Sequence, residues 1–159
     1  MSGSWFRTTR NVELSTIYYL ETEIGASWSN VNVVKSFKNA YDVAVPVVCI
    51  RLLDANSARL EVGATTLDNE YMISIDLFGK SDGQRLDLTD FIVDKLKDSW
   101  VYYLFSHATG NNSQMVKTAD GRCLVRNYIT NTRVNLEGNA VESQDRFRQN
   151  ITILVRKSI

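Results

Sequence analysis

The sequence predicts an α+β fold: a mixed or antiparallel sheet with two helices packed on one face and a long C-terminal β-hairpin. Two segments place apolar residues at helical spacing, and several others alternate apolar and polar residues as strands do. The helices do not follow strand after strand, as they would in a doubly wound fold. With 159 residues, of which 44% are apolar and 23% charged, the chain suits a single domain spanning residues 1–159.

The first helix is expected at residues 12–24. Its apolar side chains fall on one stripe, made of Leu14, Ile17, Tyr18, Leu20 and Ile24. Asn11 is a suitable N-cap for this helix, and Gly25 is a suitable stop. A short strand is expected to follow at residues 31–37.

Strand signals dominate the middle of the chain. Residues 46–54 are apolar and rich in β-branched side chains, which predicts a buried strand. The polar run at residues 54–57 predicts a turn, after which residues 59–63 would return as an antiparallel partner. Residues 70–79 alternate cleanly and predict another strand. One face of that strand carries Tyr71, Ile73, Ile75 and Leu77.

Residues 84–98 switch to a helical period and predict the second helix. Its apolar stripe consists of Leu88, Phe91, Ile92 and Leu96. Ser81 or Asp82 is a suitable cap, and the lysines of the last turn complement the helix dipole. A β-prone run at residues 100–105 predicts a further strand.

The polar segment at residues 106–121 is expected to form a loop, because its few apolar residues offset little of the entropy lost on ordering. We expect this loop to be mobile in the free protein and to become ordered at an assembly contact. The candidates for that contact are His107, Asn111, Met115 and Lys117. Residues 122–136 and 146–157 are then expected to form the long hairpin, joined by residues 137–145.

Composition excludes several classes of protein. The 18 Lys and Arg residues balance 18 Asp and Glu residues, which argues against a protein whose whole surface binds nucleic acid or an anionic membrane. Cys49 and Cys123 each lie in an apolar run, which favours buried free thiols over a disulfide framework. The N-terminus lacks the apolar segment of a signal peptide, and no apolar run approaches the roughly 20 residues of a membrane span. We therefore expect a soluble protein made in a reducing cytoplasm.

Three carboxylates share one face of the second predicted helix, because Asp87, Asp90 and Asp94 recur at helical spacing. Such a cluster can bind a divalent metal, as in a small metal-dependent hydrolase, but it is more often a solvated helix face. The one histidine, His107, has no cysteine beside it, which argues against a nucleophilic centre. Glycine-rich phosphate-binding motifs do not occur in the sequence. We therefore expect no catalytic residue, no metal and no cofactor.

Charge is distributed unevenly along the chain. Residues 40–98 carry six basic and eleven acidic side chains, whereas residues 122–159 carry seven basic and three acidic ones. Opposite blocks of this kind suit head-to-tail self-association, in which the carboxylates of the second helix would form the acidic partner face. The alternative is that the charges intermix in the folded chain and cancel.

The C-terminal arginines are candidates for a subunit interface or a channel lumen: Arg126, Arg133, Arg146, Arg148 and Arg156. Three of them share a parity with Asn150 and Thr152, and would lie on one strand face: Arg146, Arg148 and Arg156. On the preceding strand a second set shares a parity: Asn127, Asn131 and Arg133. Such a face suits a hydrated channel, an interface or an ordinary solvent-facing sheet. Recognition of bases by stacking would need more aromatic residues than Tyr128, which is alone within residues 122–145.

The order of these segments resembles that of the tail terminator (tail completion) proteins of long-tailed bacteriophages. The resemblance rests on the helix at 12–24, on the stretches PVVCIRLLD and ARLEVGA, and on EYMISIDLFG followed by a polar turn and QRLDLTDFIVDKL. It covers roughly residues 12–159 as a pattern of elements, a style that related neck and sheath-terminator proteins share.

The resemblance implies a ring, usually a homohexamer, that caps the tail tube, ends its polymerisation and offers a joining surface to the head-side connector or stopper protein. The tail tube protein would be a partner, and genomic DNA would pass through the lumen without sequence-specific binding. The chain would be a structural virion protein of the tail or neck, assembled in the host cytoplasm, with no catalysis, cofactor or membrane. A small metal-dependent hydrolase and a nucleic-acid-binding module are the alternative functions.

Overall fold

A computed structural model describes residues 6–35, 40, 43–59, 61–63, 65, 67–107, 115–134 and 147–158. Within this part of the chain lie two helices, α1 (Thr8–Ser27) and α3 (Asp82–Leu96). Six strands accompany them: β1 (Asn32–Val34), β2 (Val47–Arg59), β3 (Leu67–Phe78), β4 (Trp100–His107), β5 (Met115–Val134) and β6 (Arg148–Ser158).

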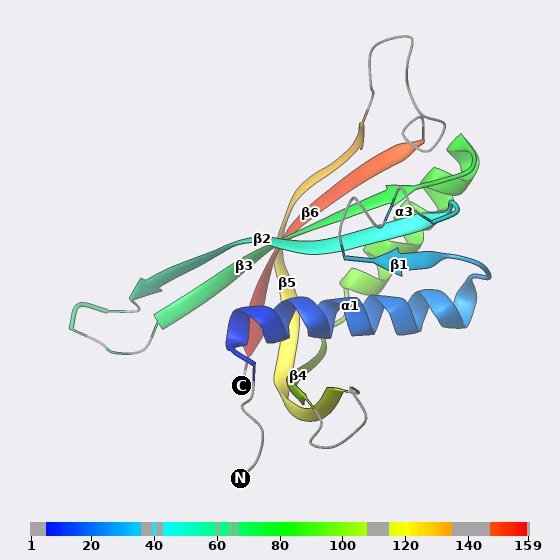
Figure 1. Ribbon diagram of the computed structural model, residues 1–159. Coiled ribbons are helices and arrows are strands. Elements are labelled where there is room, and N and C mark those ends of the chain that lie inside the picture. Colours follow the sequence, from blue (N-terminus) through cyan, green and yellow to red (C-terminus); the bar gives the residue numbers. More distant parts are fainter. Residues whose placement is uncertain are drawn as a thin grey trace.

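The six strands form one mixed sheet in the order β1-β2-β3-β6-β5-β4 (Figure 1). β1 pairs in parallel with β2, and every other pair of neighbours is antiparallel. The predicted α+β class, with two helices and a mixed sheet, is confirmed.

Helix α1 is longer than the sequence predicts at both ends. It begins after Arg7, which occupies the N-cap position without a side-chain hydrogen bond, and it continues through Gly25 to Ser27. The predicted cap, Asn11, is instead fully buried inside the helix. The helix closes where the amide of Trp28 donates to the carbonyl of Ile24 at 2.8 Å. Tertiary contacts of α1, rather than local capping signals, therefore decide its length.

Helix α3 has the predicted cap, Ser81, but it begins and ends two residues earlier than the predicted 84–98, at Asp82 and Leu96. The Ser81 hydroxyl accepts a hydrogen bond from the Gln84 amide at 3.1 Å, and Gln84 Oε1 accepts one from the Lys80 amide at 2.7 Å. This reciprocal arrangement satisfies two backbone donors at the start of the helix. Glycine is favoured at position 79 just before it, because a Cβ there would lie only 3.0 Å from the backbone nitrogen of Arg85.

The turn predicted at residues 54–57 is wrong. Strand β2 continues through these residues to Arg59, and they pair with residues 69–72 of β3 across a register shift between Leu52 and Asp54. The predicted return strand at 59–63 is therefore also wrong, since the returning strand is β3, which begins at Leu67. Every residue from Leu53 to Arg59 is exposed, so polar side chains that would disfavour a buried strand carry no penalty here.

The loop predicted at residues 106–121 is wrong over all of its described residues, which are 106, 107 and 115–121. Strand β4 extends to His107 and β5 starts at Met115, where the two strands pair. The pairing accommodates an irregularity near Gly121, whose φ of +98° lies in the region that favours glycine. The predicted strands at 122–136 and 146–157 correspond to the later part of β5 and to β6, which pair antiparallel from Arg122 to Val134.

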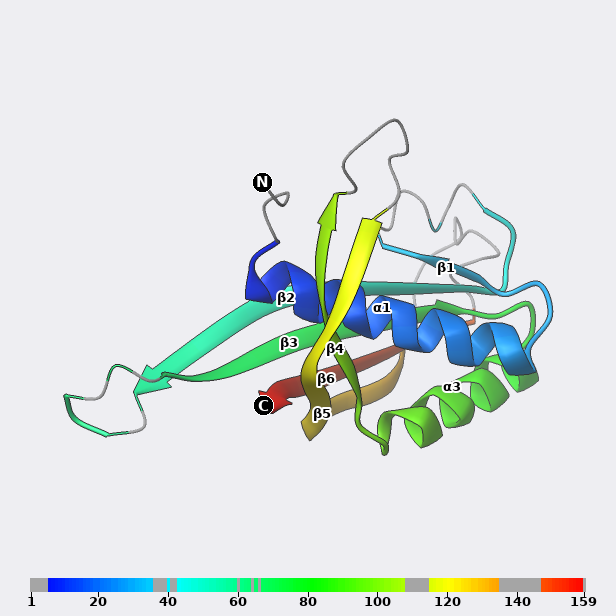
Figure 2. The ribbon, with the colours of Figure 1, turned by 90° about the horizontal axis from the view of Figure 1, so that it is seen from below.

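The main core lies on the face of the sheet that carries Ile73 and Ile75, which we call the helix face. Buried side chains of both helices and of five strands, β2 to β6, meet there, including Leu20, Ile24, Leu88, Ile92 and Trp100. Figure 2 shows α1 and α3 running next to each other against the sheet. The outer face, which carries Ser74 and Asp76, has a smaller apolar cluster of Ala40, Val47, Cys49 and Phe78.

The strands of the sheet separate at one end. β3 pairs with β6 only from Tyr71 to Phe78, so the residues of β3 before Tyr71 have β2 as their strand partner but not β6. Residues 54–59 of β2 and 67–70 of β3 thus form a two-stranded extension that projects away from the helices (Figure 1). We call this extension the arm and the remainder the body.

Candidate functional site

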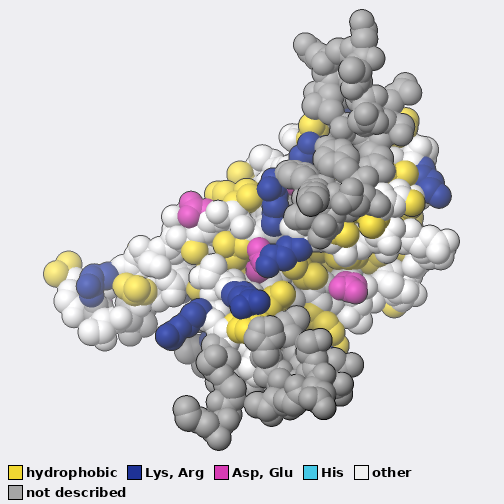
Figure 3. All heavy atoms as spheres, in the orientation of Figure 1, with side chains coloured by type: hydrophobic (Ala, Val, Ile, Leu, Met, Phe, Trp, Pro, Cys, Tyr) yellow, Lys and Arg dark blue, Asp and Glu magenta, His cyan; other side chains and the backbone are white. Residues whose placement is uncertain are grey.

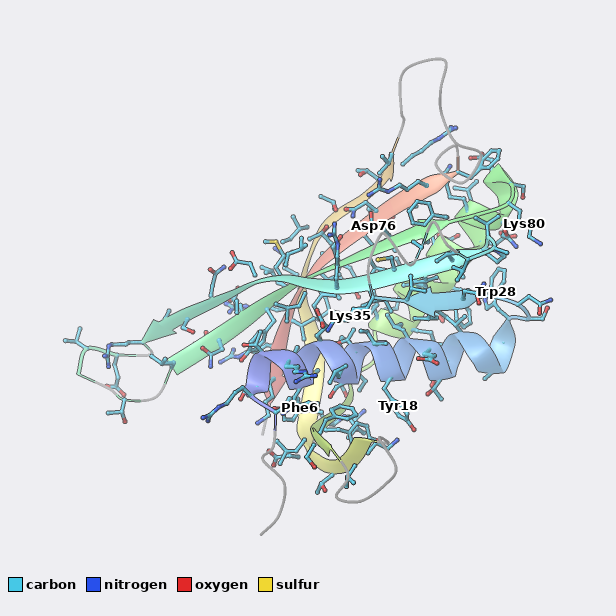
Figure 4. The ribbon with its side chains drawn as sticks, in the orientation of Figure 1. Phe6, Tyr18, Trp28, Lys35, Asp76 and Lys80 are labelled. Atoms are coloured by element: carbon cyan, nitrogen blue, oxygen red, sulfur yellow. The ribbon has the colours of Figure 1, made fainter. Side chains whose placement is uncertain are left out.

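The centre of the outer face holds a buried polar network between β3 and β6. Asp76, which is 1% exposed, accepts hydrogen bonds from Arg148 Nη2 at 3.0 Å and from Asn150 Nδ2 at 2.9 Å. The Ser74 hydroxyl donates to Asp76 Oδ2 at 3.1 Å and accepts from Asn150 Nδ2 at 3.0 Å. Figure 4 shows Asp76 among the central strands. A buried carboxylate is costly unless paired, so Arg148 serves the folded structure here.

The parity predicted for β6 is confirmed within the described residues. Arg148, Asn150 and Thr152 stand opposite Phe78, Asp76 and Ser74 on the outer face. Arg146 lies outside the described residues.

A second charged cluster joins the arm to the body on the same face. Arg156 Nη2 of β6 lies 3.1 Å from Asp68 Oδ1, and Arg126 Nη1 of β5 lies 3.6 Å from Asp68 Oδ2. Arg126 also contacts Glu70. Arg126 occupies a register shift between Val125 and Asn127, and such bulges redirect a side chain. From there its guanidinium reaches past β6 to β3.

The acidic middle and the basic end of the chain therefore meet within one molecule. Arg126, Arg148 and Arg156 each pair with an acidic residue of β3, which belongs to the acidic block at residues 40–98. Figure 3 shows several basic side chains across the middle of the face it views, with fewer acidic side chains among them. For these three arginines the structure favours intermixed charges over a segregated basic face.

Arg133 lies on a different face from the one its sequence parity predicts. A second register shift, between Tyr128 and Thr130, places Arg133 opposite Gln149 and Asn131 opposite Ile151. Asn127 stands opposite Leu154 and so lies on the outer face. The expectation that Asn127, Asn131 and Arg133 share a face is wrong, because each inserted residue reverses the alternation beyond it. Arg133 is exposed.

The acidic partner-face candidates lie together on α3, and all three are exposed: Asp87, Asp90 and Asp94. Asp94 accepts a hydrogen bond from Lys97 Nζ at 3.3 Å. Across the described part of the chain, no group of three or more His, Cys, Asp or Glu residues is arranged to hold a metal ion.

Among the assembly-loop candidates, Lys117 lies in strand β5. Its Nζ lies 3.4 Å from the centre of the Tyr18 ring and 5.0 Å from that of Tyr103, so it packs on α1 and β4. The nearby ammonium group lowers the pKa of Tyr18 through a hydrogen bond. His107 and Met115 stand opposite each other at the ends of β4 and β5, with their side chains outside the described residues. Asn111 lies outside them altogether.

Helix α1 covers the outer edge of β4, a feature that sequence reasoning missed. The Phe105 amide donates to Asn11 Oδ1 at 3.2 Å, and the Tyr103 amide donates to Ser15 Oγ at 2.9 Å. The Phe6 amide donates to the Phe105 carbonyl at 2.8 Å. These groups occupy hydrogen-bonding positions that a further strand would need. The sequence feature that could indicate this contact is the pair Asn11 and Ser15, two small polar residues four positions apart in a helix with apolar neighbours.

The two cysteines are buried free thiols, as predicted. Burial raises the pKa of Cys49 to about 11 and that of Cys123 to about 12. Both thiols are therefore protonated near neutral pH, where a nucleophile would need the thiolate.

Comparison with protein-family models and with curated proteins finds no match to this chain. Among the described residues, no helix is long and apolar enough to cross a membrane.

Proposed function

We propose that the chain is a structural subunit of a phage tail, a tail terminator that forms a ring on the tail tube. The arm is the observation that carries this proposal. Residues 53–59 are all exposed, and Leu67 at the start of the returning strand is 45% exposed. A two-stranded ribbon is only marginally stable alone in water, so a neighbouring subunit packed against it would stabilise it. An arm of this kind suits a subunit of an assembly.

In the proposed ring, the two helices cover one face of the sheet and β5 and β6 form the terminal hairpin. The ring, a homohexamer by family resemblance, ends polymerisation of the tube and joins the head-side connector or stopper protein. DNA passes through its lumen without sequence-specific binding. Arg126, Arg148 and Arg156 form ion pairs within the chain. Paired arginines attract phosphates less strongly, which supports passage of DNA through the lumen without tight binding. The chain acts in the tail or neck of the virion, without catalysis or a cofactor.

The native mass of the protein, alone and with tail tubes, tests this proposal. We expect a closed ring that binds tube ends, and Leu67→Asp on the arm should weaken its assembly. Ile129→Asp on β5 is the matched control, because Ile129 is similarly exposed at 43% but lies off the arm. A protein that stays monomeric at high concentration, with tube ends present, contradicts the proposal.

A further inference from the structure

The arm meets the body where the regular strand pairing of the sheet is interrupted. On β2, the register shift between Leu52 and Asp54 leaves Leu53 as an inserted residue. On β3, pairing with β6 stops at Tyr71, which stands opposite Ala55 of β2. Bulges bend a strand and increase its local twist. The two interruptions therefore lie within two residues of each other along the ribbon and define a short segment about which the arm can turn.

The body side of this segment is held firmly. Glu13 Oε2 of α1 accepts a hydrogen bond from the Leu52 amide at 2.7 Å, and Glu13 Oε1 pairs with Lys35 Nζ at 2.7 Å. The Tyr71 side chain is 3% exposed and belongs to the main core. Only beyond Leu52 and Tyr71 does the ribbon leave the packed part of the molecule. Any rotation of the arm is thereby confined to the level of Leu53.

Side-chain charges bridge the gap that opens between β3 and β6 beyond this level. The bridge consists of Asp68 and Glu70 on the arm with Arg126 and Arg156 on the body. The two arginine side chains are 49% and 44% exposed, whereas the two acidic side chains are 21% and 26% exposed. Ion pairs at such exposure are weakened by salt, unlike the buried pair between Arg148 and Asp76.

We infer that the arm is a hinged element whose angle to the body is set by a charge latch of Asp68, Glu70, Arg126 and Arg156. Breaking the latch leaves the β2–β3 pairing of the arm intact and frees the arm to turn about Leu53. A charged partner surface that competes for the latch residues releases the arm in the same way. The latch therefore couples arm position to salt and to the binding of such a partner.

Distances between spin labels on the arm and the body test the latch directly. Labels at Ala58→Cys on the arm and Thr132→Cys on β5 use two exposed positions, while the native Cys49 and Cys123 are 0% exposed. We expect a single narrow distance distribution at low salt. The double variant Arg126→Gln with Arg156→Gln should shift and broaden it. About 1 M salt, where the screening length falls to about 3 Å, should do the same without any substitution in the latch.

Two controls separate release of the latch from a general loosening. Arg133→Gln removes an exposed arginine of β5 outside the latch and should leave the arm–body distance unchanged. Labels at Asp87→Cys and Thr132→Cys, both in the body, should report a constant distance in every sample. An arm–body distance that stays the same in the double variant and in high salt overturns the inference. If the double variant fails to fold, the salt titration of the labelled parent decides alone.

Discussion

Strand β3 passes through two environments, and its acidic residues show how different they are. In the body, Asp76 is 1% exposed and accepts hydrogen bonds from Arg148 and Asn150. In the arm, the Asp68 side chain is 21% exposed and its partner Arg156 is 44% exposed. The same pair of residue types thus lies in the packed interior at one end of the strand and in contact with water at the other. Similar ion pairs can maintain a fold in one place and permit motion in another.

The two edges of the sheet repeat this contrast. Asn11 and Ser15 of α1 satisfy the outer amides of β4, so the body closes that edge against further strands. At the other edge, β1 covers only residues 47–49 of β2, and the part of β2 in the arm pairs with β3 alone among the described strands. The arm therefore offers an edge for association where the body does not.

The largest effect is expected from Asp76→Ala. This change leaves the Arg148 guanidinium in a mostly buried site without its carboxylate, which typically costs about 3–5 kcal/mol of unfolding free energy. Urea unfolding of the variant and the parent measures the difference. Asp76→Asn, which keeps the shape and removes the charge, separates loss of the ion pair from loss of volume. A change below about 1 kcal/mol in both variants would mean that the network is not a stabilising part of the body.

Removing the polar side chains that cover the β4 edge should have the next largest effect. Asn11→Ala and Ser15→Ala each leave a strand amide without its acceptor, at about 1–3 kcal/mol per group. Asn56→Ala, at an exposed position of the arm, should stay within about 0.5 kcal/mol. Urea unfolding measures the loss of unfolding free energy in each variant. If Asn56→Ala loses as much as Asn11→Ala and Ser15→Ala, the β4 edge and the arm do not differ in how firmly they are held.

The buried thiols predict how stability depends on pH. The pKa values of Cys49 and Cys123 are raised to about 11 and about 12, so the folded chain keeps two protons that the unfolded chain loses near pH 9. Stability is therefore lost as pH rises above about 9, by about 1.4 kcal/mol for each thiol at pH 10.

Urea unfolding at pH 8.5 and pH 10 measures this loss. Cys123→Ser should reduce the pH dependence, whereas a thiol placed on the arm by Ala58→Cys should not increase it. A pH dependence that is the same in the parent and in Cys123→Ser would contradict the assignment.

The sequence predicts the parts of the fold that bury one regular face. The alternation of β3 was predicted residue by residue, and Tyr71, Ile73, Ile75 and Leu77 are all buried. The Ser81 cap of α3 was also predicted, because capping is local chemistry. The errors fall where exposed strands carry polar residues, at 54–57 and at 115–121, since composition cannot separate such strands from loops.

The candidate site was less predictable because it depends on pairing between distant strands. The sequence indicates the arginines as candidates, but nothing in it indicates their partners Asp68, Glu70 and Asp76. The bulges in β5 decide which side chains share a face, and no residue type in the sequence marks them. The role of Asn11 was missed for a related reason, since a buried polar residue in a helix reveals its partner only when the neighbouring strand is placed.

Among the changes that remove a side-chain contact, Asp68→Ala should have the smallest effect on stability, and it gives the sharpest comparison with Asp76→Ala. Both changes remove an aspartate of β3 that lies on the outer face and pairs with an arginine of β6. After Asp68→Ala, water can solvate the half-exposed Arg156, so the free energy of unfolding should change by no more than about 1 kcal/mol. The same urea unfolding experiment measures both variants, and high salt should remove most of the small loss at Asp68 and little of the loss at Asp76. A loss at Asp68 as large as that at Asp76 would mean that the arm is packed as firmly as the body, and the division of β3 into two environments would fail.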